Sequence, residues 1–180
     1  WDFDWSDAVE QQALRTELNL NVSGGGQKNQ YFFSAGYLND KGIALESGYQ
    51  RFNLRSNITS EMTSWLKGGV NMSFAHSMQN YPVSSDTKTS NVINAGRTMP
   101  GFYPIYEVNP NDGSIIYKDG SPVPDFGPYR PSGSMANWNL PATLPLDKSE
   151  RMKDEFSGRT FLEVTFIPGL KFKTSFNFDL

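Results

Sequence analysis

Few residues of this 180-residue sequence are of a type that could carry catalysis or bind a metal. His76 is the single histidine and cysteine is absent, so a transition-metal site would need clustered carboxylates, which the sequence does not supply. We predict that His76 is a surface residue near a strand end. Asp112 lies in Asn-Pro-Asn-Asp-Gly, which lacks the further oxygen ligands and the closing glutamate of a calcium loop. A plain turn is the favoured interpretation, because Asn, Asp and Gly tolerate turn dihedrals.

Acid–base catalysis on a sugar would need two carboxylates held at a fixed separation. The sequence brings no two of its candidate acids together: Glu107, Asp112, Asp119 and Asp125. The glycines of Gly24–Gly26 lie in a predicted hairpin turn and do not open a helix after a strand, so they do not predict a phosphate-binding loop. We therefore predict no catalytic residue, no metal and no cofactor.

Aromatic residues in a Pro-rich stretch are the better candidates for contact with a ligand. Aromatic planes stack on the apolar faces of sugar rings and also bind peptides. The alternative, which we favour, is that these rings pack the stretch onto itself and onto a lid protein. The candidate ligand-contacting or lid-contacting residues are Tyr103, Tyr106, Tyr117, Tyr129 and Trp138.

The elements that would position these residues are mostly strands. Apolar and polar residues alternate with a period of two, which is typical of strands with one apolar and one wet face. The alternation predicts four strands within residues 15–77 and a two-strand hairpin within 152–180. Several of these strands exceed the ~5–6 residues of ordinary strands and reach the ~9–11 residues that cross a membrane. Trp65, Tyr31 and Tyr49 fall near strand ends, where amphipathic rings favour the membrane boundary.

The connections between these strands are of two kinds. We predict turns at 24–29, 61–64 and 168–169 on one side, and the connection 40–48 and the Pro-rich stretch 78–151 on the other. A structureless loop as long as 78–151 is abnormal in a compact domain and ordinary on the outer side of a membrane barrel. Within it, a small hairpin is predicted around Lys118-Asp-Gly120. Residues 4–13 are predicted to form a short helix, with Ser6 or Asp7 as its cap.

Composition and charge restrict the partners. The net charge is −3 and no stripe of Lys or Arg is present, so nucleic acid is not an expected partner. No apolar run approaches the ~20 residues of a membrane helix, which leaves a barrel open because its strands expose one face to lipid. On this interpretation the charged residues point into the barrel lumen. They are Glu17, Arg51, Arg55, Lys67, Arg159, Glu163, Lys171 and Lys173.

Several segments resemble one known family in their order and spacing. They begin with Leu-Asn-Val-Ser-Gly-Gly-Gly at 20–26 and Tyr-Phe-Phe-Ser-Ala-Gly-Tyr-Leu-Asn-Asp-Lys-Gly-Ile at 31–43, and continue at 51–57, 65–73, 94–106 and 161–173. From Trp5 onward the sequence resembles the barrel of the SusC/RagA family of TonB-dependent outer-membrane transporters, typical of Bacteroidota.

This resemblance implies import of a nutrient, an oligosaccharide or a peptide, across the outer membrane. It also implies a SusD-like surface lipoprotein as a lid and a TonB complex that supplies energy through an N-terminal plug. Neither the plug nor the TonB-contacting segment is visible in the sequence, which we expect to be an internal piece of a longer protein.

The expected fold is all-β: an antiparallel transmembrane β-barrel segment of about six strands plus a long extracellular loop, part of a larger plugged barrel in contact with outer-membrane lipid. The expected division is a loop with a short helix over 1–14, four strands over 15–77, the loop over 78–151 and the hairpin over 152–180. Two alternatives remain open, a soluble all-β carbohydrate-binding module and a β-rich glycoside hydrolase.

Overall fold

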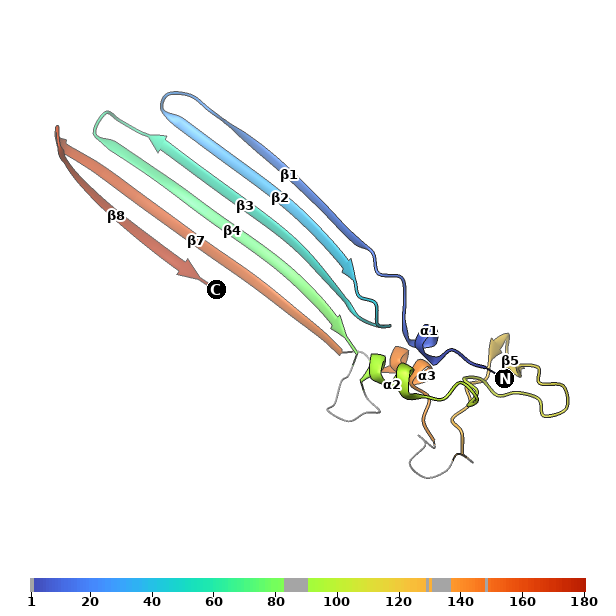
Figure 1. Cartoon of the computed structure of the whole chain (residues 1–180). Coiled ribbons are helices and arrows are strands. Elements are labelled where there is room, and N and C mark those ends of the chain that lie inside the picture. The colour runs from blue at the N-terminus through green and yellow to red at the C-terminus, as the bar shows by residue number, and fades with distance from the viewer. Residues whose placement is uncertain (1, 83–90, 129, 131–136, 148) are drawn as a thin grey trace. The chain divides into compact units, whose positions relative to one another are not determined.

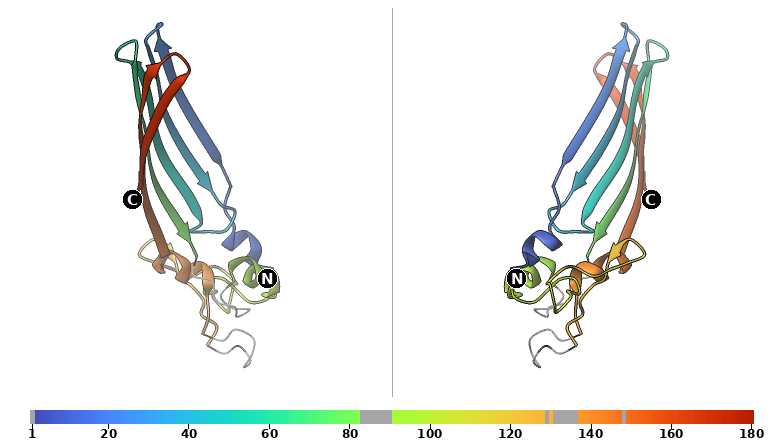
Figure 2. Two further views of the ribbon diagram at one scale, coloured as in Figure 1. Left: turned by 90° about the vertical axis from the view of Figure 1, so that its left-hand side faces the viewer. Right: turned by 90° about the vertical axis from the view of Figure 1, so that its right-hand side faces the viewer.

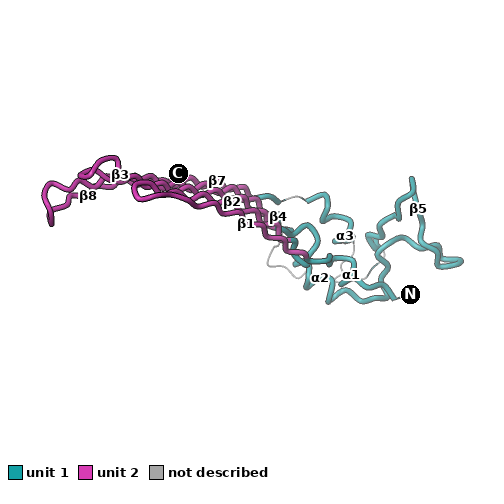
Figure 3. The backbone as a smooth tube through the Cα atoms, turned by 90° about the horizontal axis from the view of Figure 1, so that it is seen from above, with its two compact units in different colours: residues 1–13, 41–48, 80–150 teal, residues 14–40, 49–79, 151–180 magenta. Residues whose placement is uncertain are grey.

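The chain divides into two compact units (Figure 3). Unit 1 comprises residues 1–13, 41–48 and 80–150, and unit 2 comprises residues 14–40, 49–79 and 151–180. The structure, a computed structural model, describes residues 2–82, 91–128, 130, 137–147 and 149–180. The two units differ in architecture and are described in turn.

Unit 2 is built on one six-stranded antiparallel sheet with the strand order β1-β2-β3-β4-β7-β8 (Figure 1). This confirms the predicted six strands. They range from 10 to 19 residues, well above the length of ordinary globular strands. Their bounds are β1 Arg15–Gly25, β2 Asn29–Lys41, β3 Gly48–Glu61, β4 Leu66–Tyr81, β7 Ser149–Ile167 and β8 Leu170–Asp179.

Strand register places the apolar residues in rows on one face of the sheet. Leu18 pairs with Tyr37 and Val22 with Phe33 across β1 and β2, and Val164 pairs with Phe172 across β7 and β8. Successive side chains on a strand point to opposite faces, so these matched pairs form one continuous apolar surface.

That apolar surface is not covered by a second layer. Figure 2 shows the strands as a single twisted sheet, and Leu20 and Phe176 keep 67% and 66% of their surface exposed. Leu38 is the one large apolar side chain of unit 2 that is buried among the residues the structure describes. A soluble sandwich would bury such rows between two sheets, so the soluble carbohydrate-binding module is not supported.

Three tight turns join β1 to β2, β3 to β4 and β7 to β8 at the same end of the sheet (Figure 1). The predicted Pro168-Gly169 turn is present between β7 and β8, and Gly169 has a φ of 91° there. A residue with a Cβ adopts this conformation only with strain, so glycine is suited to the position. The longer connections, 42–47 and 82–148, leave the sheet at its other end, as predicted.

Unit 1 contains short helices and one small hairpin. The helices are α1 Trp5–Val9, α2 Val92–Thr98 and α3 Leu140–Thr143, followed by the 3-10 helix η1 Leu144–Leu146. The hairpin pairs β5 Tyr117–Lys118 with β6 Ser121–Pro122, which confirms the turn predicted at Lys118-Asp-Gly120. None of the helices in the described part of the chain has both the length and the apolar character needed to cross a membrane.

The helix near the start is shorter than predicted, and its cap is a different residue. α1 covers residues 5–9 rather than 4–13, because Glu10 is extended and the Gln11 amide donates to the Ile43 carbonyl. Asp4, and not Ser6 or Asp7, is the cap, since its carboxylate accepts a hydrogen bond from the Asp7 amide at 3.0 Å.

The described residues of the stretch 78–151 are not structureless, which corrects the expectation of an irregular loop there. Together with α1 it forms two clusters of buried apolar residues. The first contains Val9, Val92, Ala95, Leu140 and Leu144, and the second contains Trp5, Met99 and Ile105. Unit 1 therefore has an apolar core of its own, assembled from segments far apart in the sequence.

Candidate functional site

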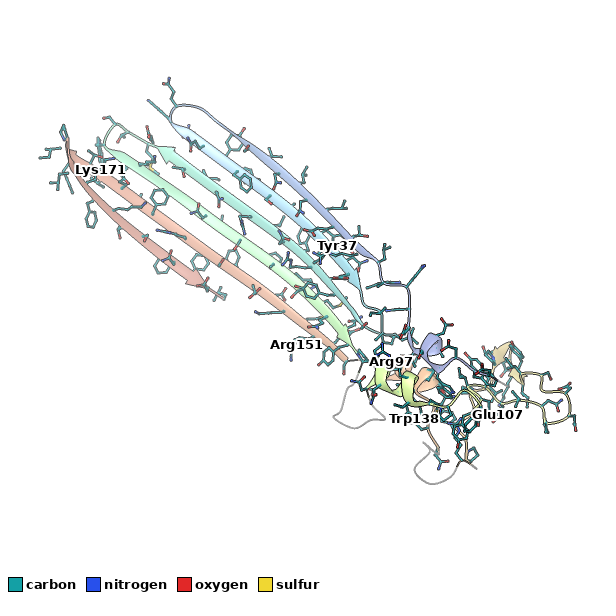
Figure 4. All side chains as sticks on the ribbon, viewed as in Figure 1. Tyr37, Arg97, Glu107, Trp138, Arg151 and Lys171 are labelled. Carbon is teal, nitrogen blue, oxygen red and sulfur yellow. The ribbon has the colours of Figure 1, made fainter. Side chains whose placement is uncertain are left out.

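Two of the five aromatic candidates, Trp138 and Tyr103, pack against the core of unit 1 and contact Trp5. The rings of Trp138 and Trp5 are stacked, with centroids 6.0 Å apart and an interplanar angle of 25°. The Trp5 indole Nε1 donates to the Tyr103 carbonyl at 2.9 Å. Figure 4 shows Trp138 among the densely packed side chains of this unit. Trp138 and Tyr103 are both partly buried and pack against the Trp5 cluster.

Arg130 is the polar centre of this aromatic cluster. Its guanidinium carbon lies 5.6 Å from the centroid of the Trp5 ring and 5.1 Å from that of Tyr103, within the range of cation–π attraction. The side chain is 4% exposed and forms an ion pair with Asp125 at 3.2 Å. It also donates to the carbonyls of Trp138 and Pro104 at 3.1 and 3.0 Å. A buried guanidinium with these partners holds three chain segments together.

Two further residues complete the surroundings of Arg130. Gly127 has a φ of 58°, and a side chain at this position would occupy the space of the Arg130 guanidinium, so only glycine fits. Asn139, which is 1% exposed, donates to the carbonyls of Ile105 and Asp125 at 2.7 and 3.0 Å. Its Oδ1 accepts from the Ala142 amide and so caps α3. The sequence analysis singled out neither Arg130 nor Asn139, because each is recognised only by contacts with distant segments.

Of the other three aromatic candidates, one shares this position and one is exposed. Tyr106 is partly buried against the Trp5 cluster. Tyr117 lies on β5 with 62% of its surface exposed, so its ring is accessible to a ligand or a partner protein. Tyr129 lies outside the described residues. Among the described candidates, Tyr117 is therefore the one most open to contact from outside.

Two of the four acidic candidates, Asp112 and Asp125, have local structural partners. Asp125 is the ion-pair partner of buried Arg130. Asp112 Oδ1 accepts hydrogen bonds from the amide and hydroxyl of Ser114 at 3.0 and 2.7 Å, the geometry of the predicted plain turn. These bonds, the backbone one first, hold the pKa of the Asp112 carboxyl below its usual 3.8. Groups of three or more potential metal ligands do not occur among the residues described.

His76 lies within β4 and not in a loop at the strand end. Its Nδ1 is 2.6 Å from Asp154 Oδ1 on the neighbouring β7, and both side chains are exposed. The predicted surface position is correct, but β4 continues past His76 to Tyr81. The pair links two strands and has the simple geometry of a cross-strand contact.

The second candidate surface is the polar face of the sheet. Figure 4 shows side chains projecting from every strand, with Lys171 beside the β7–β8 turn. Lys171 Nζ is 3.2 Å from Glu163 Oε1, and Lys67 Nζ is 3.6 Å from Glu61 Oε1. The face also borders a hollow of about 540 Å³ that Arg51 and Arg55 line. A charged surface of this kind stays in contact with water or with another polar surface.

Comparisons with known proteins show which proteins this chain is similar to. No family model matches the chain. Over 98% of its length the chain is 25% identical to TonB-dependent receptor P3 of Formosa agariphila, and it spans 16% of that protein. Over 43% of its length it is 30% identical to TonB-dependent receptor SusC of Bacteroides thetaiotaomicron, and it spans 8% of that protein.

Solved structures agree with these relatives. The RagAB peptide transporter matches 99% of the chain with a TM-score of 0.67 and 26% identity, and the chain covers 19% of it. The RagAB importer in its closed-closed state matches with a TM-score of 0.73 at 24% identity. The chain is homologous to the SusC/RagA-type TonB-dependent receptors.

Homology with SusC/RagA-type receptors explains a sheet that has no covering layer. These receptors are transporters and not enzymes, and they belong to the outer membrane of Bacteroidota. The six strands match a segment of the RagA barrel. In such a wall one sheet face contacts lipid and the other faces the interior. The separation of apolar and charged residues onto opposite faces in unit 2 matches this arrangement.

Proposed function

We propose that the chain is part of the wall and one outer loop of a TonB-dependent importer, which carries an oligosaccharide or a peptide across the outer membrane. The observation that carries the proposal is the separation of the two sheet faces. Leu20 and Phe176 belong to an uncovered apolar face, whereas Arg51, Arg55 and Lys171 lie on the opposite face. A wall between lipid and a polar conduit needs both surfaces.

The soluble alternatives do not account for this separation. A carbohydrate-binding module would bury the apolar rows, and a glycoside hydrolase would hold two carboxylates across a sugar. Of the acidic candidates, Asp125 is occupied by Arg130 and Asp112 by Ser114. Import is therefore the better account of the geometry.

The partners of the proposed importer are a SusD-like surface lipoprotein that acts as a lid and a TonB complex that supplies energy through parts of the protein beyond this chain. The solved RagAB structures support a two-component importer. Tyr117 supports a contact with the lid or with the nutrient, because its ring is exposed on the β5–β6 hairpin. The hairpin belongs to unit 1, whose Trp5 cluster is packed against by Tyr103, Tyr106 and Trp138.

Deletion of the gene in the native bacterium tests the import function. We expect loss of growth on an oligosaccharide or peptide mixture that wild-type cells use, with recovery when the full-length gene is restored. Uptake by wild-type cells should stop when a protonophore collapses the inner-membrane gradient, because TonB-dependent import needs it. Unchanged growth and uptake in the deletion strain on every mixture tested would refute the importer.

A Tyr117→Ala variant of the full-length receptor tests the exposed hairpin. We expect normal folding and at least a threefold loss of lid co-purification or of nutrient uptake, since the ring packs against no core. Lys118→Ala, on the same strand and also exposed, is the control and should retain both. Equal behaviour of the two variants would remove Tyr117 from the candidate contact residues.

A further inference from the structure

Three arginines on the polar face of the sheet form no ion pair among the residues that the structure describes. Of the other cations of this face, four lie within 4.0 Å of a carboxylate oxygen, whereas the Nζ of Lys173 lies 4.6 Å from the centroid of the Phe161 ring. These pairs are Arg15 with Glu17 and Asp40, Lys67 with Glu61, Lys153 with Glu155, and Lys171 with Glu163. Among the residues that the structure describes, Arg51, Arg55 and Arg159 take part in no such pair, and all three are exposed.

The three arginines lie along one continuous surface, which we call the arginine lane (Arg51, Arg55 and Arg159). Arg51 and Arg55 are four residues apart on β3, about 13 Å along a strand, and both line the hollow of about 540 Å³. Arg55 also lines a neighbouring hollow together with Arg159 of β7. Between them, the hydroxyls of Ser73 and Ser157 lie 2.6 Å apart and join β4 to β7.

The charge of the lane is positive. Its hollows contain two carboxylates, Glu155 and Asp179. Glu155 is held by Lys153 at 2.6 Å, which leaves Asp179 against three guanidinium groups. Guanidinium groups bind carboxylates through paired N–H donors, and such bonds are stronger than those between neutral groups. The chemistry that fits the lane is therefore a chain of carboxylates.

The side chains around the arginines favour a peptide over an acidic sugar. Sugar rings are held by stacking on an aromatic plane, yet Tyr49 is the single aromatic side chain of the polar face at the larger hollow. Phe74 and Phe156 also border that hollow, but they line the opposite, apolar face as well. The amides of Asn53, Asn57 and Asn177 line the two hollows and supply donors and acceptors that match peptide groups.

We propose that the arginine lane binds the carboxylates of acidic oligopeptides as they pass through the importer. The proposal rests on the proposed function and narrows its cargo to peptides rich in Asp or Glu. Arginines at this spacing can engage two side chains of an extended peptide four residues apart, because peptide and strand have the same rise of ~3.3 Å per residue.

The test compares two peptides of equal length and shape on the full-length receptor with its lid partner. One octapeptide carries four aspartates, and the other carries asparagines at the same positions. We expect the purified wild-type complex to bind the aspartyl peptide at least tenfold more tightly. In the triple variant Arg51→Gln, Arg55→Gln, Arg159→Gln this preference should disappear while the asparaginyl peptide binds as before. The control, Lys67→Gln with Lys171→Gln, removes two paired cations of the same face and should keep the preference.

Other outcomes would overturn the proposal. Equal binding of the two peptides by the wild type, or an unchanged preference in the triple variant, would show that the lane does not select carboxylates. Loss of binding of both peptides in a folded triple variant would show that the arginines do not act by selecting carboxylates. An arginine-dependent preference for a uronic oligosaccharide without one for the aspartyl peptide would show that the cargo is a glycan.

A folding defect does not block the test. If heating shows that the triple variant has lost the compact barrel form, the single variant Arg55→Gln decides, with an expected loss of at least threefold in the preference. Transport separates the two proposals: wild-type cells that import neither peptides nor oligosaccharides would refute the importer, whereas the binding preference of the purified complex would still decide the role of the lane.

Discussion

Unit 1 buries Trp5, Val9 and Leu144 to 2%, 1% and 3% exposure, whereas the sheet of unit 2 leaves Leu20, Phe172 and Phe176 at 67%, 56% and 66%. Both regions are rich in apolar residues, so composition does not separate them. The two regions differ in the medium that surrounds them. Unit 1 shields its own apolar side chains, as a segment in water must, while the sheet depends on lipid to cover its apolar face.

Hydrogen bonding shows the same contrast. In unit 1, Arg130 and Asn139 satisfy main-chain carbonyls of distant segments from within the core. The sheet satisfies its backbone through strand pairing, and β1 and β8 at the ends of the order each pair on one side only. Unpaired strand edges are not stable in a membrane, so we infer that neighbouring strands of the receptor complete both edges.

Removing a core ring of unit 1 should have the largest effect. Trp5→Ala in the full-length receptor is expected to cost about 3–5 kcal/mol of local stability, because it leaves a cavity beside Trp138 and Arg130. Hydrogen exchange of residues 91–128 and 137–147 would measure it. Leu146→Ala, at an 84% exposed position, is the control and should leave exchange unchanged. Equal protection in both variants would contradict a core in unit 1.

A charge on the apolar face should come next. Leu20→Arg is expected to destabilise the folded receptor in lipid by about 2–4 kcal/mol, the cost of a cation near mid-membrane. Asn21→Arg, one residue along on the polar face, should cost much less. The measurement is the free energy of unfolding from vesicles, and similar costs for the two variants would mean that the faces are wrongly assigned.

Loss of the buried asparagine should have a smaller effect. Asn139→Ala removes the α3 cap and leaves the Ile105 and Asp125 carbonyls without this donor, at a cost of about 1–3 kcal/mol. Among the hydrogen bonds of the described residues, Asn91→Ala removes the cap of α2, which is worth about 1 kcal/mol. Hydrogen exchange of the backbone amides in α3 and α2 measures the stability cost of each variant. A larger cost for Asn91→Ala would show that the tertiary contacts of Asn139 add nothing.

The smallest effect concerns the Asp112 turn. Its carboxyl should titrate with a pKa below 3.8, because the ionised form accepts two hydrogen bonds from Ser114. A depressed pKa stabilises the turn above the unfolded value of 3.8, and this stabilisation is lost as the pH falls through the folded pKa. A carboxyl-detected NMR titration measures it. Ser114→Ala keeps the backbone donor and should raise the Asp112 pKa only part of the way back to 3.8. An unchanged pKa in this variant would show that the Ser114 hydroxyl does not contribute to the shift.

Much of the sheet could be predicted from the sequence. A strand directs every second residue to the same face, so the row Leu18, Leu20 and Val22 identifies both a strand and its apolar side without any knowledge of its partners. The Gly-rich turn after it then fixes the neighbour and the register. The predicted end of β4, Ser77, was four residues short of Tyr81, because pairing extends this strand beyond the alternation.

Strand membership, the apolar face of each strand and the positions of the tight turns follow from local periodicity and from glycine, so they could be predicted before the fold was known. The core formed by the long connection between β4 and β7 became visible in the folded structure. Its helices of four to seven residues are too short to show a helical period. Arg130 acquires its role from Trp5, Tyr103 and Asp125, which reach it only when the chain has folded, since burial and charge pairing are properties of the assembled core.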